Sequence, residues 1–107
     1  MKTWPRVSRL ADAQISEALI RTFETYGEHK YREYQDLIEL ALETLADQPR
    51  INRLRPEIRP EARVHHIKQP GRRARHLFLY YVADDGVANI VAFIYDGMDL
   101  PEQWPAG

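Results

Sequence analysis

The spacing of apolar residues changes once along this chain of 107 residues, at about Pro49, and the change limits the folds available to it. Before Pro49, apolar side chains recur every three or four residues, which is typical of helices with one buried face. After it, short runs of β-forming residues end at turn residues, as in strands. Because helices come first and most strands follow them, the pattern predicts an α+β fold rather than alternating strands and helices.

Two helices are predicted before Pro49. Ser8 can cap the first helix by accepting a hydrogen bond from a free amide of its first turn, and Gly27 is placed to end it. Its apolar positions are Leu10, Ala11, Ile15, Ala18, Leu19, Phe23 and Tyr26. The apolar positions of the second helix are Tyr31, Tyr34, Leu37, Ile38, Ala41, Leu42 and Leu45. Because only Gly27 and Glu28 link the two helices, we expect an antiparallel hairpin.

Strands are predicted before and after this hairpin. They share a high content of β-forming residues and cover residues 3–7, 63–68, 77–82 and 87–95. Pro5 weakens the first strand and suits the edge of a sheet, and Asp85 and Gly86 form a turn between the last two strands. We expect the last dozen residues to be irregular. The predicted fold is βααβββ in a single domain over residues 1–107, with the helical hairpin packed on one face of a sheet that ends in a three-stranded antiparallel meander.

Charge is unevenly distributed, although the formal net charge is only −1. Residues 9–49 and 77–107 each carry a net charge of −5, whereas residues 50–76 carry +7. Arginine supplies eight of the nine basic residues in that middle block, and its planar guanidinium group suits carboxylates and phosphates. We therefore expect residues 50–76 to face an acidic partner, the alternative being a solvated surface whose charges neutralise one another after folding.

Several classes of protein do not fit the composition. The absence of cysteine excludes disulfides, thiolate zinc sites and thiol nucleophiles. The longest apolar run, residues 77–83, has 7 residues, whereas a membrane-spanning helix needs about 20, so no membrane partner is expected. No apolar leader is recognisable, and we expect a cytoplasmic location. His65 and His66 should point to opposite faces of a strand, and neither a metal site nor a cofactor is expected.

A metal-free ribonuclease is the candidate enzyme. It would need cations for the cleaved phosphate together with a general acid and a general base. The candidate catalytic residues are Arg72, Arg73, Arg75 and His76. Tyr80, Tyr81 and Tyr95 lie nearby in sequence, but tyrosines in dense strands are more often part of a core. Because residues 77–107 contain no Lys, Arg or His, the pattern favours a protein without chemistry of its own.

The alternative of a hydrated magnesium site rests on Asp96, Asp99 and Glu102, which follow the last strand. Solvated acidic residues at a strand end are the simpler interpretation. The same tail contains Met98 and Trp104, which either pack back over the sheet or anchor a partner. The candidate partner-binding residues are Arg50, Arg53, Arg55, Arg59, Arg63, Arg72, Arg73, Arg75, Met98 and Trp104.

Four segments in this order resemble the ParE/RelE toxin superfamily. Ser8 with residues 11–15 is similar to the start of the family's first helix, although Gln14 stands where an acid is usual. Residues 42–49 resemble the end of its second helix, and residues 75–82 resemble its third strand. Residues 90–99 resemble an ending common among ParE-like members. Together these segments span nearly the whole chain.

The resemblance implies a small bacterial toxin of a type II toxin–antitoxin system, encoded beside an antitoxin that wraps around it and neutralises it. ParE-type members poison DNA gyrase, whereas RelE-type members cut mRNA in the ribosome with basic and tyrosine residues near the end of the last strand. Here that neighbourhood, residues 95–100, contains no cation, which favours the ParE branch.

The partners that the resemblance implies are DNA gyrase and a ParD-like antitoxin. We expect the antitoxin to be acidic and partly disordered, with a helix that binds an apolar groove between the helical hairpin and the sheet. We expect no sequence-specific DNA binding by the chain itself. The alternatives are a ribosome-dependent endoribonuclease and a non-toxic relic that serves as a co-repressor.

Overall fold

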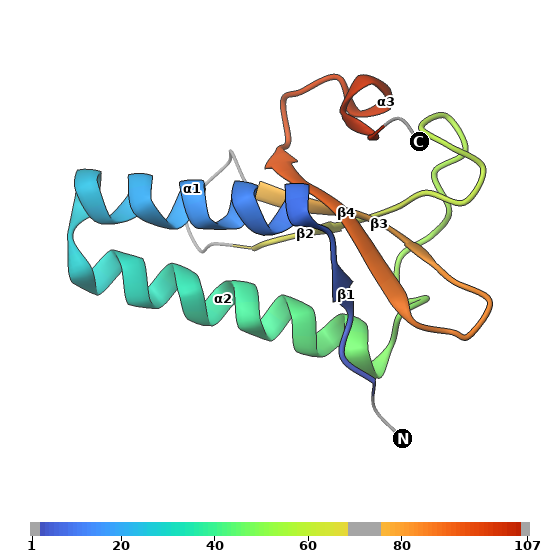
Figure 1. Ribbon diagram of the computed structural model, residues 1–107, viewed down its shortest axis with the longest axis horizontal. Helices are drawn as coiled ribbons and strands as arrows, with labels where there is room; N and C mark the ends of the chain where they lie inside the picture. Colours follow the sequence, from blue (N-terminus) through green and yellow to red (C-terminus); the bar gives the residue numbers. More distant parts are fainter. Residues whose placement is uncertain (1–2, 69–75, 106–107) are drawn as a thin grey trace.

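The computed structural model describes residues 3–68 and 76–105. Its elements in chain order are β1 (Arg6–Val7), α1 (Arg9–Tyr26), α2 (Glu28–Asp47), β2 (Arg63–His66), β3 (His76–Val82), β4 (Ala88–Tyr95) and α3 (Leu100–Gln103). Figure 1 shows α1 and α2 lying side by side as a hairpin next to the sheet. The predicted α+β class and the βααβββ order are confirmed, with α3 added at the end.

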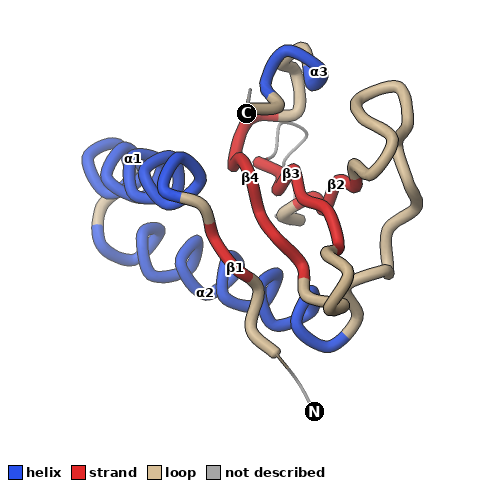
Figure 2. The backbone as a smooth tube through the Cα atoms, turned by 45° about the vertical axis from the view of Figure 1, so that its right-hand side comes forward, coloured by secondary structure: helices blue, strands red, loops and turns tan. Residues whose placement is uncertain are grey.

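The four strands form one sheet in the order β1-β4-β3-β2. Figure 2 shows β1 and β2 at its two edges. β2, β3 and β4 form the predicted antiparallel meander, and β1 runs parallel to β4. The first strand is shorter than the predicted residues 3–7, because only Arg6 and Val7 pair with β4.

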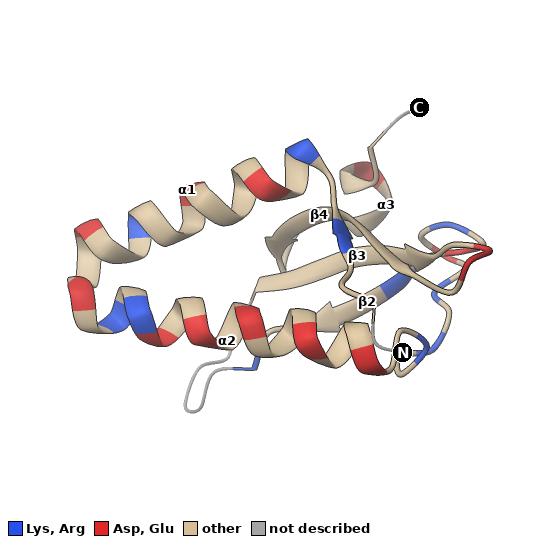
Figure 3. Ribbon diagram, turned by 60° about the horizontal axis from the view of Figure 1, so that its bottom comes forward, with Lys and Arg blue, Asp and Glu red and all other residues tan. Residues whose placement is uncertain are grey.

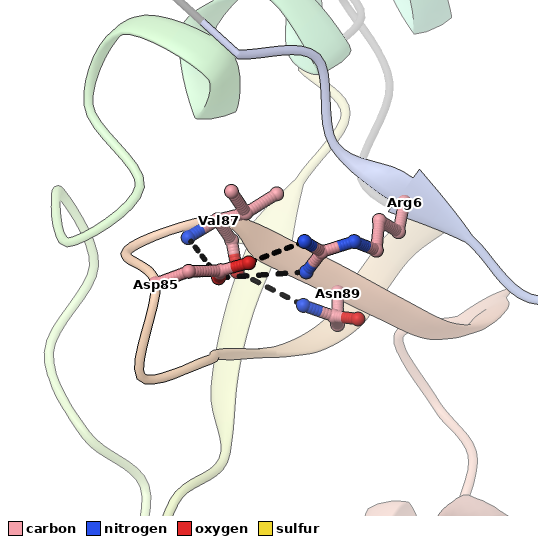
Figure 4. Close-up of polar contacts among 4 residues, drawn as sticks. All are labelled: Arg6, Asp85, Val87 and Asn89. Atoms are coloured by element: carbon pink, nitrogen blue, oxygen red, sulfur yellow. Dashed lines mark hydrogen bonds and ion pairs between the residues drawn. The ribbon is translucent and has the colours of Figure 1, made fainter.

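The turn between β3 and β4 is held by polar contacts that reach the edge strand β1, which pairs with β4 (Figure 4). Gly86 has a φ of +81°, which glycine adopts readily and other residues rarely do. Asp85 pairs with Arg6 of β1, accepts a hydrogen bond of 3.1 Å from the Val87 amide, and has its pKa lowered chiefly by the guanidinium group. The Asn89 amide group donates to the Val87 carbonyl at 2.9 Å.

Side chains in the first turns of α1 and at its cap form hydrogen bonds with backbone groups of β4 that β1 does not pair. Ser8 caps the helix as predicted, accepting from the Ala11 amide at 3.0 Å, and its hydroxyl donates to the Val91 carbonyl at 3.2 Å. The Gln14 side-chain oxygen accepts from the Phe93 amide at 2.8 Å. Because β1 is too short to pair beyond Ile90, these side chains supply partners that a longer strand would have supplied.

Gly27 alone joins the two helices, since α2 already begins at Glu28. Its φ of +87° lies in the region that glycine tolerates at helix ends, and its amide donates to the Phe23 carbonyl at 2.8 Å. The antiparallel hairpin predicted from this short link is confirmed.

Apolar side chains bury both faces of the sheet. The helix-facing core consists of Ala11, Tyr34, Ile38, Ala41, Leu45, Ile67, Phe78, Tyr80, Ala88, Ile90 and Phe93. The core on the other face consists of Ile58, Ala62, Val64, Leu77, Leu79, Ala92 and Ile94, with Leu100 and Trp104 packed against it. The dense apolar run of β3 follows from this arrangement, because each side chain meets a covered face whichever way it points.

The end of the chain differs from the prediction. Residues 100–103 form the short helix α3 where an irregular segment was expected, and Trp104 follows it. The ring of Trp104 lies 6.3 Å from that of Tyr81 on β3. The helix therefore brings the tail back over the sheet. Across the described residues, no helix has the length and apolar character needed to cross a membrane.

Candidate functional site

The segment between α2 and β2 carries most of the predicted partner-binding arginines that the structure describes. We call residues 50–63 the arginine loop. Arg50, Arg53 and Arg59 are exposed, whereas Arg55 is half-buried and pairs with Glu57. Arg63 is also half-buried and donates to the Asn52 carbonyl. Three of these five arginines are therefore presented to solvent, and two are engaged in contacts within the loop.

A buried polar network fixes the arginine loop to the sheet. The side-chain amide of Asn52 donates to the Tyr80 hydroxyl at 3.0 Å and lies 2.9 Å from Nδ1 of His65. The Tyr80 hydroxyl donates in turn to the Pro49 carbonyl at 2.9 Å. Burial raises the pKa of Tyr80 and lowers the pKa of His65, so both groups are neutral at pH 7. Asn52 was missed in the sequence because an asparagine in a loop gives no distinguishing signal.

The predicted ribonuclease residues are only partly described. Arg72, Arg73 and Arg75 lie outside the described residues. His76 begins β3 and packs among aromatic rings, stacked on Phe93 at 4.6 Å between ring centroids and tilted against Tyr95 at 4.0 Å. The Tyr34 hydroxyl on α2 is hydrogen-bonded to its Nδ1.

Burial and the contact with Tyr34 together bear on the charge and the tautomer of the His76 ring. Burial lowers the pKa of His76 to about 4, with a further contribution from the Arg21 guanidinium group, so the ring is neutral at pH 7. Burial raises the pKa of Tyr34, which keeps its proton. We assign the donor role to the Tyr34 hydroxyl, which has no other acceptor among the described residues, and this assignment places the ring proton on Nε2.

His76 lines an open pocket of about 270 Å³ between α1 and the end of β4, which we call the His76 pocket. Gln14, Ala18 and Arg21 of α1 form one side of it, and Tyr95 and Met98 form the other. The structure thus brings the predicted partner residue Met98, with 44% of its surface exposed, next to His76. The sequence did not identify Arg21 or Tyr34 as site residues. Arg21 was considered only in the net charge of its segment, and Tyr34 only as a core position of its helix.

A second, smaller groove lies between α2 and β2, where the sequence predicted an apolar groove formed by the hairpin and the sheet. It has a volume of about 210 Å³, and Leu37, Leu40 and Ile67 form part of its lining. Leu40 is 60% exposed, the highest value among the exposed large apolar side chains of the described residues. Figure 3 shows acidic segments at intervals along α2. The α2 residues that line the groove are uncharged, and Lys68 lies on its other side.

Trp104 does not join Met98. It is half-buried and lines a different groove together with Leu10 and Tyr81. Of the two roles considered for this tail, packing over the sheet is the one that the structure describes for Trp104.

The histidines and acids do not assemble into a metal centre in the part of the chain that the structure describes. No three His, Asp or Glu side chains come together there in a way that could hold an ion. His65 joins the network around Tyr80, while Nε2 of His66 lies 3.7 Å from a carboxylate oxygen of Asp96. Adjacent in sequence, these two histidines serve different contacts, as expected for opposite faces of a strand.

Comparison with known families gives one match. The model of the family described as the ParE toxin of the type II toxin–antitoxin system parDE matches residues 6–100, from β1 to the first residue of α3. No curated protein matches the chain.

Proposed function

The chain belongs to the family of ParE toxins of type II toxin–antitoxin systems, and from this premise we propose that it inhibits DNA gyrase, blocks replication and is neutralised by a tightly bound antitoxin. The family match over residues 6–100 carries the proposal. We place its action in the bacterial cytoplasm, where gyrase acts on DNA.

The end of β4 supports an inhibitor that acts by binding alone. Residues 95–100 supply two carboxylates and no cation, so the groups that stabilise a cleaved phosphate are missing from this position. We propose that the protein is not an enzyme and needs no cofactor.

The charge of the arginine loop supports an acidic, ParD-like antitoxin. Arg50, Arg53 and Arg59 are exposed on a loop that Asn52 and Tyr80 hold in place, so their guanidinium groups are available to partner carboxylates. The groove beside Leu40 offers apolar surface to a helix of the same partner. We propose that both surfaces bind one antitoxin chain.

A gyrase assay tests the proposed target. Purified protein should block supercoiling of relaxed plasmid or trap cleaved DNA, and the same protein bound to its antitoxin should do neither. The candidate antitoxin is the product of the neighbouring gene. Unchanged gyrase turnover at a large molar excess of the free protein would contradict the proposal.

One observation favours the ribonuclease as a second candidate. His76 and Arg21 line the His76 pocket, with Tyr34 hydrogen-bonded to His76 from behind, and such groups serve as acid, base and phosphate ligand in metal-free nucleases. Against it, the pKa of His76 is about 4, so the imidazole ring is not protonated at pH 7 and cannot act as an imidazolium acid. Discrete mRNA cuts by translating ribosomes with the wild-type protein, and their loss in a His76→Gln variant, would establish this alternative.

Expression of the chain alone in a bacterial host separates these activities from the non-toxic co-repressor. Filamentous cells are the expected result, because stalled replication prevents division. Short static cells would indicate translation arrest and favour the ribonuclease. Normal growth with ample folded protein would contradict toxicity and leave only the co-repressor.

A further inference from the structure

We propose that the His76 pocket binds a glutamate side chain of the antitoxin. The pocket donates hydrogen bonds, the carboxylate accepts them, and this site is separate from the arginine loop. This inference rests on the proposed function in one respect, since the antitoxin is the source of the glutamate. The residues that carry it are Gln14, Arg21 and His76, with Tyr34 acting from behind.

Apart from the carboxylate of Glu17 and the hydroxyl of Tyr95, the polar side chains that line the pocket have hydrogen-bond donors to offer. Because Tyr34 takes Nδ1 of His76, the ring has only its Nε2 proton left to offer. The side-chain oxygen of Gln14 is taken by the Phe93 amide, so its amino group is what remains. Arg21 adds a guanidinium group with several N–H donors. A carboxylate, which only accepts hydrogen bonds, complements this set.

Glu17 also lines the pocket, and its carboxylate is the group with which an incoming carboxylate competes for Arg21. One of its oxygens lies 2.8 Å from a single guanidinium nitrogen of Arg21. The two side chains are 69% and 63% exposed, so both can reorient at little cost. The remaining N–H groups of Arg21 allow a second carboxylate to bind beside Glu17 or to replace it.

The shape of the pocket favours a carboxylate on an aliphatic stem. Its volume of about 270 Å³ exceeds the roughly 150 Å³ that holds a benzene ring, but it is too small for a turn of helix. Ala18 and the rings of Phe93 and Tyr95 provide apolar walls for methylene groups. A glutamate side chain fits both the walls and the donors.

A protein partner fits better than a free small anion. Tyr95 and Met98 line the pocket and are each 44% exposed, which leaves apolar surface beside the donors that an isolated anion would not cover. The net charge of residues 50–76 independently calls for an acidic partner. A segment of antitoxin with a glutamate next to apolar residues satisfies both features.

A titration with small probes tests the donor set without the antitoxin. The N-methylamide of N-acetylglutamate, whose only charge is its side-chain carboxylate, should shift the imidazole ¹⁵N signals of His76 in a saturable way and raise the pKa of His76, because a carboxylate stabilises the protonated ring. The N-methylamide of N-acetylglutamine, of nearly the same size but uncharged, should not. An Arg21→Gln variant should lose the response, while Arg32→Gln should keep it. Arg32 is a matched control because it pairs with Glu28 at the same 2.8 Å and the same helical spacing.

Equal shifts with the glutamine probe, or an unchanged response in Arg21→Gln, would overturn the subsite. If the free probes shift the His76 signals but Arg21→Gln does not weaken antitoxin binding, the pocket is not a binding site for the antitoxin.

Binding of the antitoxin then distinguishes the two proposals. Arg21→Gln should weaken binding by at least about tenfold, the value of one charged hydrogen bond, whereas Arg32→Gln should change it by less than about twofold. If the wild-type chain does not bind the neighbouring gene product, the proposed function fails. If the wild-type chain binds it and Arg21→Gln binds equally well, the subsite alone fails.

Discussion

The hydrogen bond with the Tyr34 hydroxyl limits which hydrogen bonds His76 can make with a ligand. Tyr34 is only 4% exposed and its hydroxyl is hydrogen-bonded to Nδ1, while burial lowers the pKa of His76 and keeps the imidazole neutral at pH 7. In the sequence Tyr34 was assigned to the buried stripe of its helix, and it is buried. Its contact with His76, which is 42 residues away, depends on how the hairpin lies on the sheet and cannot be read from local spacing.

Protonation of His76 should make the stability of the protein depend on pH. The folded-state pKa of about 4 lies below the ordinary 6.5, so the unfolded chain takes up the proton first as pH falls. The free energy of unfolding should therefore decrease between pH 6.5 and 4, by up to about 3 kcal/mol. Urea unfolding at pH 7.0, 5.5 and 4.5 measures the loss.

The double variant Tyr34→Phe/His76→Phe is the control for this pH dependence, because it removes both polar partners together. It should keep only the smaller loss that comes from His65, whose pKa is also lowered by burial. An equally steep loss in the double variant would contradict the assignment to His76.

Gln14 and Ser8 illustrate what a local pattern can and cannot predict. The cap formed by Ser8 was predictable because the spacing from a cap residue to its helix is fixed. The bonds from Ser8 and Gln14 to Val91 and Phe93 span about 80 residues, and they exist because β1 leaves part of β4 unpaired. Such hydrogen bonds depend on the sheet topology, so they cannot be predicted from the spacing of residues along the chain.

At the scale of elements, the side chain of Asn52 links the arginine loop to two strands of the sheet. Replacing Asn52 with alanine removes its bonds to His65 and Tyr80 and leaves polar atoms of both without that partner. We expect a loss of about 1–3 kcal/mol in the free energy of unfolding, measured by urea titration. Gln48→Ala, at an exposed position on the same segment, should change it by less than about 0.5 kcal/mol. Equal effects of the two substitutions would show that the network does not hold the loop.

The exposed arginines of this loop should contribute to antitoxin binding as a group. The triple variant Arg50→Gln/Arg53→Gln/Arg59→Gln should weaken binding by about 10- to 100-fold at 0.1 M salt, since each exposed pair contributes up to about 1 kcal/mol. The matched control, Arg9→Gln/Lys30→Gln/Arg32→Gln, removes three exposed charges from the helices and should have little effect. Calorimetric titration of both variants measures the difference, and similar losses would indicate a nonspecific effect of net charge.

Most elements were predictable because their apolar periods are long. Helices of 18 and 20 residues and strands of 7 and 8 residues carry enough repeats to be recognised, and their observed ends lie close to the predicted ones. α3 has four residues, one of them Pro101, and shows no period at all. The cover that Ile58 and Ala62 provide over the far face of the sheet was likewise hidden within a loop.

At the scale of the whole molecule, charge is separated in space as well as in sequence. Figure 3 shows acidic segments along α2 and basic segments in the loop that follows it. The net charge of −1 is a sum over these regions and describes neither of them. An acidic partner is attracted by the loop and repelled by the outer side of α2, so electrostatics should orient the antitoxin as well as attract it.

The salt dependence of the antitoxin complex should reveal two components of binding. The Debye length falls from about 10 Å at 0.1 M salt to about 3 Å at 1 M, which screens the exposed guanidinium groups. Apolar contacts in the groove beside Leu40 are not screened. We therefore expect the Kd to rise by about 10- to 100-fold over this range while the complex persists at micromolar concentrations.

The triple arginine variant separates these components within the same measurement. Since it lacks the three exposed guanidinium groups of the loop, its Kd should rise less between 0.1 M and 1 M salt than that of the wild type, and at 1 M the two proteins should bind nearly equally. Complete dissociation of the wild-type complex at 1 M would mean that charge supplies nearly all of the affinity. A salt response in the variant as steep as in the wild type would place the charged contact outside the arginine loop, because the loop would then have no exposed arginine left to screen.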